Sequence, residues 1–147
     1  MSGILIAIVC GILSAVPNIA VLKSSDLSAY NDSFEGLRDV LENVDVHEYV
    51  LEGEKGKGEG VIEEMLQTQP KVVVSIGAKA GELCSRKIQD IPIVFTMVND
   101  LEKYGLMKKN ITGVLMEVSP ESQFAIVRSV FPFLKNVGVI YDPSKTG

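Results

Sequence analysis

Small hydroxyl and carboxylate side chains follow an apolar run near the start of the chain. The run Ile19–Leu22 is followed by Lys23 and then by Ser24, Ser25 and Asp26. Side chains of these types either cap the next helix or hold a polar ligand by hydrogen bonds. The sequence contains no nucleophile elbow, zinc signature or kinase motif, so these residues are better suited to holding a molecule than to transforming it. We assign no catalytic residue.

Two later segments have the same character. "GAKAG", residues 77–81, follows the β-branched run 71–76, and "TMVND", residues 96–100, ends the apolar run that starts at Ile91. Small residues leave backbone N–H groups accessible and leave room for a ligand. Lys79 is interpreted either as a surface charge or as a ligand contact.

Composition excludes several classes of function. The net charge is -5 and the pI about 4.9, which argues against a nucleic-acid partner because phosphate binding needs a basic surface. His47 is the one histidine, so a multi-histidine metal site is excluded. No metal and no cofactor are expected. Cys84 is predicted to be a small buried residue on a helix.

Strand and helix patterns alternate along most of the chain. Short apolar runs predict strands, and apolar residues at helical spacing predict helices between them. A helix is expected to begin at Ser119-Pro120-Glu121, with the serine as its cap, and to reach Leu134. The predicted strands are 19–22, 45–51, 71–77, 91–98, 111–118 and 136–143, and the predicted helices are marked by Tyr30–Leu41, Val61–Leu66, Ala80–Ile88 and Phe124–Phe131.

This alternation predicts an α/β fold, a parallel sheet with helices on both faces. Ligands of such sheets bind beyond the carboxyl ends of the strands, where the strand order reverses. The segments after residues 22, 76 and 95 should therefore meet at one edge of the sheet. The glycine-rich stretch 52–60 matches no phosphate-binding motif and is predicted to be a solvated loop.

The first residues are apolar. Ile4–Leu13 is followed by small residues and Pro17, which favours an export signal in residues 1–17 over a membrane anchor, a core strand or a misplaced start. An export signal would place the protein in the periplasm or otherwise outside the cytoplasm.

Several stretches together carry a family resemblance. "IAVLKSSDLSAYNDSFEGLRDVL", "KVVVSIGAKAGEL", "IPIVFTMVND", "NITGVLMEVSPESQF" and "VGVIYDPSKTG" resemble, in this order, solute-binding proteins of ABC transporters with a type I periplasmic-binding-protein fold. The resemblance implies two α/β lobes that close on a small solute, with amino acids, aromatic ones in particular, as the favoured class. It implies no enzymatic activity, and a permease and an ATPase as partners.

The resemblance also implies which residues contact the solute. They lie in the loops after the first, third and fourth strands, with Tyr30 beside them. "GAKAG" departs from the hydroxyl- or proline-containing turn of many relatives, which bears on the specificity of that loop. The implied contacts are Ser24, Ser25, Asp26, Tyr30, Gly77, Ala78, Lys79, Thr96, Met97, Val98 and Asn99.

By the same resemblance, residues 18–118 form the amino-terminal lobe and residues 119–147 the first helix and strand of a second lobe. Three explanations stay open: a fragment, a protein completed by another chain, or a one-lobe variant. Because Phe124 and Phe131 would otherwise form an exposed apolar patch, residues 119–147 are expected to pack on the first lobe or to pair with a second copy.

Two other functions are kept as alternatives. One is a single-domain, flavodoxin-like protein that binds a nucleotide or phosphate, with Asp26 and Asp100 available for a metal. The other is a fragment without function. The phosphate-binding glycines that the first of these needs are absent from the sequence.

Overall fold

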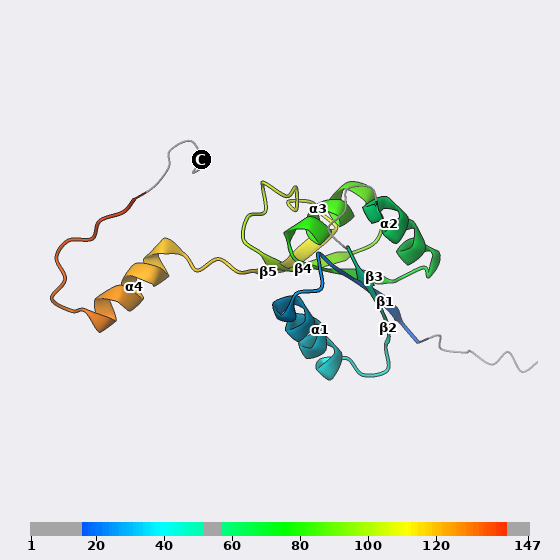
Figure 1. Cartoon of the computed structure of the whole chain (residues 1–147), viewed down its shortest axis with the longest axis horizontal. Coiled ribbons are helices and arrows are strands. Elements are labelled where there is room, and N and C mark those ends of the chain that lie inside the picture. Colours follow the sequence, from blue (N-terminus) through cyan, green and yellow to red (C-terminus); the bar gives the residue numbers. More distant parts are fainter. Residues whose placement is uncertain (1–15, 52–56, 141–147) are drawn as a thin grey trace, which may run out of the picture. The chain divides into compact units, whose positions relative to one another are not determined.

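The computed structural model describes residues 16–51 and 57–140 (Figure 1). Most of the predicted export signal and the first part of the glycine-rich stretch, residues 52–56, lie outside these ranges. No helix of the described residues has the length and apolar character needed to cross a membrane. The elements are β1 (Asn18–Lys23), α1 (Ser28–Val40), β2 (Asp45–Val50), α2 (Lys57–Gln67), β3 (Val72–Ile76), α3 (Ala78–Lys87), β4 (Ile93–Val98), β5 (Ile111–Leu115) and α4 (Pro120–Val130).

The chain divides into two compact units, residues 1–116 and 117–147. The described part of the first unit contains a five-stranded sheet in the order β2-β1-β3-β4-β5, and every neighbouring pair of strands is parallel. The predicted α/β fold with a parallel sheet is therefore confirmed. The unit boundary lies close to the end of the predicted lobe at residue 118.

Helices cover both faces of this sheet. Figure 1 shows α1 on one face and α2 and α3 on the other. Alternate residues of β1 point to opposite faces: Ala20 and Leu22 pack in a cluster with α2 and α3, whereas Val21 packs in a cluster with Phe34 of α1. Because both faces are buried, the central strands are continuous apolar runs rather than alternating ones.

The start of α2 differs from the prediction. Residues 57–60, expected to be part of the loop, form the first turn of α2. Glycine disfavours helices by about 1 kcal/mol relative to alanine. However, a Cβ on Gly58 would lie 3.0 Å from a methyl carbon of Leu83 in α3. The close approach of the two helices, which only the folded structure reveals, outweighs the local preference.

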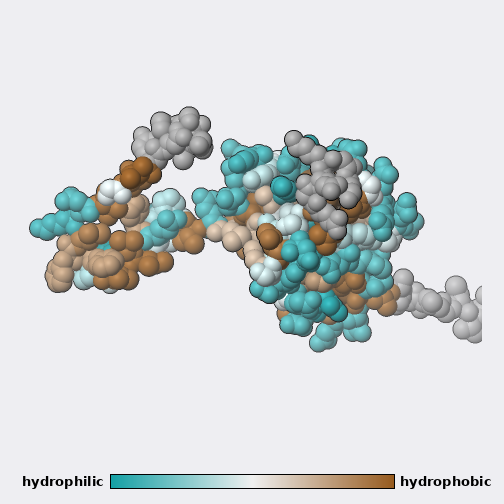
Figure 2. Space-filling view, viewed as in Figure 1, coloured by the Kyte–Doolittle hydropathy of each residue, from teal (hydrophilic) through white to brown (hydrophobic). Residues whose placement is uncertain are grey.

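The described residues of the second unit, 117–140, are all exposed. The predicted cap of α4 is confirmed, because Ser119 Oγ accepts a hydrogen bond of 3.3 Å from Ser122 N. The helix ends at Val130 rather than Leu134 and has no buried residue. The strand predicted from residue 136 is absent from residues 136–140, since a strand needs a neighbour for its backbone hydrogen bonds. Figure 2 shows mostly apolar colours over this unit.

Candidate ligand-binding rim

Three neighbouring strands end at the same level of the sheet. Lys23 lies opposite Ile76, and Ile76 lies opposite Thr96. Beyond the strands, Ser24 N donates to Ile76 O and Gly77 N donates to Thr96 O, both at 2.9 Å. These bonds bring the predicted loops to one edge, which we call the carboxyl rim. It consists of residues 24–26, 77–79 and 96–99.

The strand order reverses in the middle of the rim. From β1 the chain passes through α1 to β2 on one side, and the next strand, β3, pairs with β1 on its other side. The segments after β1 and β3 therefore leave toward opposite faces, α1 on one and α3 on the other (Figure 1). Ligands of such sheets bind at this kind of strand reversal, beyond the carboxyl ends of the strands.

Ser24 connects the segment after β1 to the start of α3. The residue is 4% exposed, and its Oγ accepts a hydrogen bond of 2.9 Å from Ala80 N in the first turn of α3. It does not cap the helix that follows it in the sequence. That helix, α1, has Leu27 at its N-cap position and no side-chain cap. The interpretation of "SSD" as a cap for the next helix is therefore wrong: the serine satisfies a distant helix instead.

Gly77 allows this close contact. Its backbone has φ 92° and ψ 161°, a conformation that is essentially restricted to glycine. A Cβ at this position would lie 2.6 Å from Ser24 Oγ and 2.8 Å from Tyr30 Cζ. A side chain would push both residues away. The structure thus brings together Ser24, Gly77 and Tyr30, which come from three different segments.

The end of β4 is irregular. Its pairing with β5 shifts between Phe95 and Val98, and Met97 has a positive φ of 61°. Non-glycine residues adopt this conformation at a cost of about 1–3 kcal/mol, and such residues cluster at functional sites. Met97 packs beside Ile76 on the α1 face. Val98 is 1% exposed and packs in the core, so its side chain does not contribute to the rim.

The other predicted contacts are more open. Ser25, Ala78 and Thr96 are half-buried. Asp26, Lys79 and Asn99 are exposed at the rim. Asp100 closes the turn after β4, because its Oδ1 accepts a hydrogen bond of 2.9 Å from Lys103 N. Among the described residues, no three metal-ligating side chains lie together.

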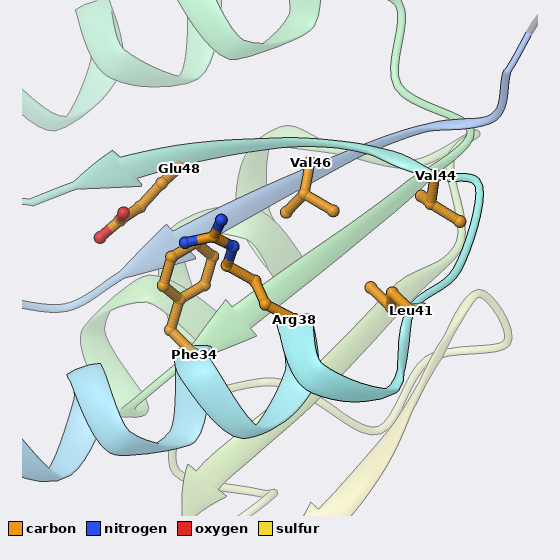
Figure 3. A pocket seen from close by; sticks show the side chains of 6 residues that line it. All are labelled: Phe34, Arg38, Leu41, Val44, Val46 and Glu48. Carbon is orange, nitrogen blue, oxygen red and sulfur yellow. The ribbon is translucent and has the colours of Figure 1, made fainter.

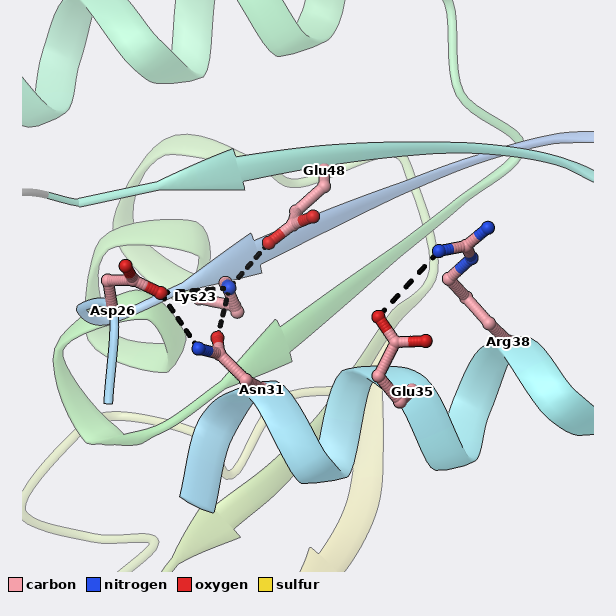
Figure 4. A network of polar contacts seen from close by, with 6 residues as sticks. All are labelled: Lys23, Asp26, Asn31, Glu35, Arg38 and Glu48. Atoms are coloured by element: carbon pink, nitrogen blue, oxygen red, sulfur yellow. Dashed lines mark hydrogen bonds and ion pairs between the residues drawn. The ribbon is translucent and has the colours of Figure 1, made fainter. Parts of the chain in front are cut away.

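The predictions missed a polar network at the rim (Figure 4). Lys23 is 3% exposed, and its ammonium lies 2.5 Å from Glu48 Oε1 and hydrogen-bonds to Asn31 Oδ1. A signal was present in the sequence. Ile19, Val21 and Lys23 alternate along β1, so the lysine had to share their buried face and needed an acidic partner there. The identity of that partner depends on strand register.

A groove beside this network lies between α1 and β2 (Figure 3). Its volume is about 440 Å³, and Figure 3 shows Phe34 and Arg38 of α1 facing Val46 and Glu48 of β2. None of the predicted contact residues lines it. The groove and the carboxyl rim are therefore separate features.

Cys84 has the structural role that was predicted. It is fully buried in α3. Burial raises the pKa of its thiol to about 12. The side chain is therefore a neutral, apolar core group at physiological pH and not a nucleophile.

A parallel α/β lobe with small and hydroxyl-bearing residues gathered at its strand reversal has the architecture of a ligand-binding lobe. Comparison with known proteins defines the family more closely. Residues 18–147 match the model of the ABC transporter substrate binding protein family, and the chain belongs to that family. It is 22% identical over 135 residues to a tyrosine-binding protein of Clostridioides difficile strain R20291, covering 88% of this chain and 38% of that protein.

Solved structures share the fold. A ligand-free, open substrate-binding protein with adhesive properties from Clostridium difficile superposes with a TM-score of 0.68 at 17% identity, over 80% of this chain and 45% of that one. An ABC domain from Streptococcus pneumoniae in complex with L-Trp superposes with a TM-score of 0.62 at 19% identity, and the match covers 69% of this chain and 39% of that one. A conserved domain protein from Vibrio cholerae superposes with a TM-score of 0.64 at 23% identity, and the match covers 88% of this chain and 49% of that one. The chain thus spans less than half the length of these relatives.

Proposed function

We propose that this chain is part of the solute-binding component of an ABC importer and that its carboxyl rim forms one side of the solute site. The observation that carries the proposal is the meeting of Ser24, Gly77 and Tyr30 at the strand reversal. The proposed role is binding, without catalysis. Closure of a second lobe over the rim would bury the solute and provide the remaining contacts.

The proposed solute is an amino acid with an aromatic side chain. Relatives of this chain include a tyrosine-binding protein and a protein solved with L-Trp. The rim offers chemistry for each part of such a molecule. The amino ends of α1 and α3 favour a carboxylate, because their first-turn N–H groups carry partial positive charge. The exposed Asp26 carboxylate suits the ammonium group, and Tyr30 and Met97 offer apolar surface to the ring.

The family also suggests where the protein works and with which partners. Substrate-binding proteins of ABC transporters act outside the cytoplasm and deliver their solute to a permease driven by an ATPase. The same is proposed here. Residues 117–147 are proposed to belong to a second lobe. The apolar side chains of α4 would be covered by other parts of that lobe or by a second copy of the chain, because contiguous apolar surface of this kind seeks a partner.

The proposal can be tested by a nuclear magnetic resonance titration of the chain with L-tyrosine and L-tryptophan. Chemical shift changes are expected at the carboxyl rim and not at the groove between α1 and β2. The des-amino analogue 3-(4-hydroxyphenyl)propionate should bind more weakly than tyrosine. Asp26→Asn should weaken tyrosine binding by roughly tenfold or more and so remove most of this preference, because a hydrogen bond to a charged group contributes about 1.5–3 kcal/mol.

Asp90→Asn is a matched control for this experiment. Asp90 is exposed and precedes β4, at the opposite end of the strands from the rim. Its replacement makes the same change in net charge and should leave tyrosine binding unaltered. Saturable shift changes confined to the groove between α1 and β2, or shift changes produced only by a nucleotide, would contradict the proposal.

A further inference from the structure

A one-way chain of polar contacts runs from the edge of the sheet to the rim (Figure 4). Glu48 on β2 pairs with Lys23 at the end of β1, and Lys23 donates a hydrogen bond to Asn31 Oδ1 on α1. Asn31 Nδ2 in turn donates to Asp26 Oδ1 at 2.9 Å. Glu48 and Asp26 are thus linked through Lys23 and Asn31, and the Lys23 ammonium also lies 3.7 Å from Asp26 Oδ1.

The chemistry of the groups determines which atom donates and which accepts in each of these hydrogen bonds. An ammonium group can only donate hydrogen bonds, so Asn31 must turn its amide oxygen toward Lys23. The amide nitrogen then faces Asp26, whose ionised carboxylate can only accept. Lys23 therefore sets the orientation of the Asn31 amide, and that amide sets the position of Asp26.

Lys23 is unusual for a residue whose only role would be packing. Its side chain is 4% exposed, and lysine is almost never buried unless it is paired. The charged or aromatic groups around its ammonium are Glu48 at 2.5 Å, Asp26 at 3.7 Å and the ring of Phe34 at 5.7 Å. An apolar residue would continue the stripe of Ile19 and Val21 without the cost of removing a charge from water.

Asp26 is the residue of this polar network whose side chain depends on its neighbours for a fixed orientation. Its side chain is 76% exposed, and the contacts described for it, with Asn31 and Lys23, both use Oδ1. An exposed carboxylate without such support would rotate among several side-chain conformations. With Oδ1 held, the orientation of the whole carboxylate, and so of its second oxygen, is restricted.

We propose that Lys23 and Asn31 are positioning residues that orient the Asp26 carboxylate toward the ammonium group of the solute. The contact with the solute rests on the function proposed above, whereas the orientation of Asp26 does not. The inference extends that function to residues behind the rim that do not touch the solute. Its consequence is that selectivity for the amino group depends on Asn31 and Lys23 as well as on Asp26.

The first test uses Asn31→Leu, which removes the hydrogen bond to Asp26 and leaves the contacts of Lys23 with Glu48 and, at 3.7 Å, with Asp26. Thermal unfolding should change little, but the side-chain order parameter of Asp26, measured at its Cβ methylene group, should fall toward flexible values. Tyrosine should bind about tenfold more weakly, with no change for its des-amino analogue. Asp32→Leu, at an exposed position one residue along α1, is the control and should alter neither property.

The second test separates positioning from stability. Lys23→Met alone leaves Glu48 without its partner and should destabilise the fold, whereas Lys23→Met with Glu48→Gln should recover stability, because both charges are then removed. In the double variant Asp26 should remain mobile and tyrosine binding should remain weak. A role in stability alone would instead restore binding together with the unfolding temperature, and that result would overturn the proposal.

The two proposals fail in distinguishable ways. If the unaltered chain shows no tyrosine binding at any accessible concentration, the proposed function fails, and the order parameter of Asp26 still tests the positioning role. If tyrosine binds at the rim but Asn31→Leu changes neither the order parameter nor the preference for the amino group, the positioning role is overturned while the function stands.

Discussion

The two units of the chain differ in whether their apolar residues find partners within the unit. In the first unit, Leu22, Met65 and Ile76 are completely buried between the sheet and its helices. In the second unit, α4 has no buried residue, and Phe124 and Phe131 are 48% and 59% exposed. Both units contain apolar side chains at helical spacing, so composition alone does not account for the difference.

The difference shows which parts of the structure depend on local signals and which depend on a partner. The cap at Ser119 and the proline that follows it are sufficient to start α4 without a core. A strand has no such local support, because its hydrogen bonds come from a neighbour. For this reason the residues from 136 to 140 carry an apolar pattern but form no strand, whereas the similar runs of the first unit do.

The largest expected effect comes from removing a buried side chain of the first unit. Leu22→Ala should lower the free energy of unfolding by about 2–5 kcal/mol, because it loses buried apolar surface and leaves a cavity. The matched change in the second unit, Phe124→Ala, should stay within about 0.5 kcal/mol at low protein concentration. Urea unfolding followed by circular dichroism measures both.

This pair of variants can also contradict the contrast between the two units. A loss above about 1 kcal/mol for Phe124→Ala would exceed the effect of an ordinary surface substitution and would show that α4 is covered in solution. If the cover is a second copy, the loss will grow with protein concentration, and sedimentation will detect a dimer that the variant weakens.

A glycine pair within the first unit is expected to give the next largest effect. Gly77→Ala should destabilise the fold by about 1–3 kcal/mol from backbone strain, and by more from its contact with Ser24 and Tyr30. Gly36 lies within α1 and has open space around its Cα, so Gly36→Ala should stabilise by about 0.5–1 kcal/mol. Thermal unfolding of both variants measures the contrast.

The Gly77 variant also tests the geometry of the rim. Because the new methyl group would displace Ser24 and Tyr30, the amide signal of Ala80, which donates to Ser24 Oγ, should shift in the Gly77→Ala spectrum. Equal stability of the two alanine variants, with an unchanged Ala80 signal, would mean that residue 77 does not hold the three segments together.

The sheet and its rim could be predicted because they depend on patterns that are short in sequence. The runs at 19–22, 72–76 and 93–98 are apolar except for Ser75 and Thr96, and their alternation with helices leaves few topologies for a parallel sheet. Once the strands are parallel, their carboxyl ends must share an edge. Ser24, Gly77 and Thr96 could be placed together on that ground alone.

The contacts that organise the rim could not be predicted in the same way. The bond from Ala80 N to Ser24 Oγ joins residues 56 positions apart, and the Lys23–Glu48 pair depends on the register between β1 and β2. Neither leaves a local pattern. The start of α2 was missed for a related reason, since Gly58 is explained by its approach to Leu83 of another helix.

The smallest expected effect on stability comes from the protonation of two glutamates, one in each unit. The hydrogen bond and charge of Lys87 lower the pKa of Glu59 below its ordinary 4.5, and the two side chains are 2.6 Å apart. This pair links the first turn of α2 to the end of α3. In the second unit, hydrogen bonds from its own backbone N–H and from the Ser119 hydroxyl lower the pKa of Glu121, whose bonds stay within one helix turn.

The sign of the pH dependence follows from these directions. A carboxyl group whose pKa is lower in the folded state stabilises that state above its unfolded pKa, and the contribution is lost as the pH falls through the folded value. Acidification below about pH 4.5 should therefore weaken the α2–α3 link and lower the unfolding temperature of the first unit. The same change at Glu121 should only fray the start of α4, which is seen as faster amide exchange there.

Glu59→Gln should remove the first of these effects, with a shift in unfolding temperature smaller than for either substitution above, because the pair is exposed. The measurement is the difference in unfolding temperature between pH 7 and pH 3.5, compared with Glu63→Gln at another exposed position of α2. An unchanged difference in Glu59→Gln would show that the pair is open in solution. A pH-dependent global transition that disappears in Glu121→Gln would show that α4 unfolds together with the first unit, and the contrast between the two units would then fail.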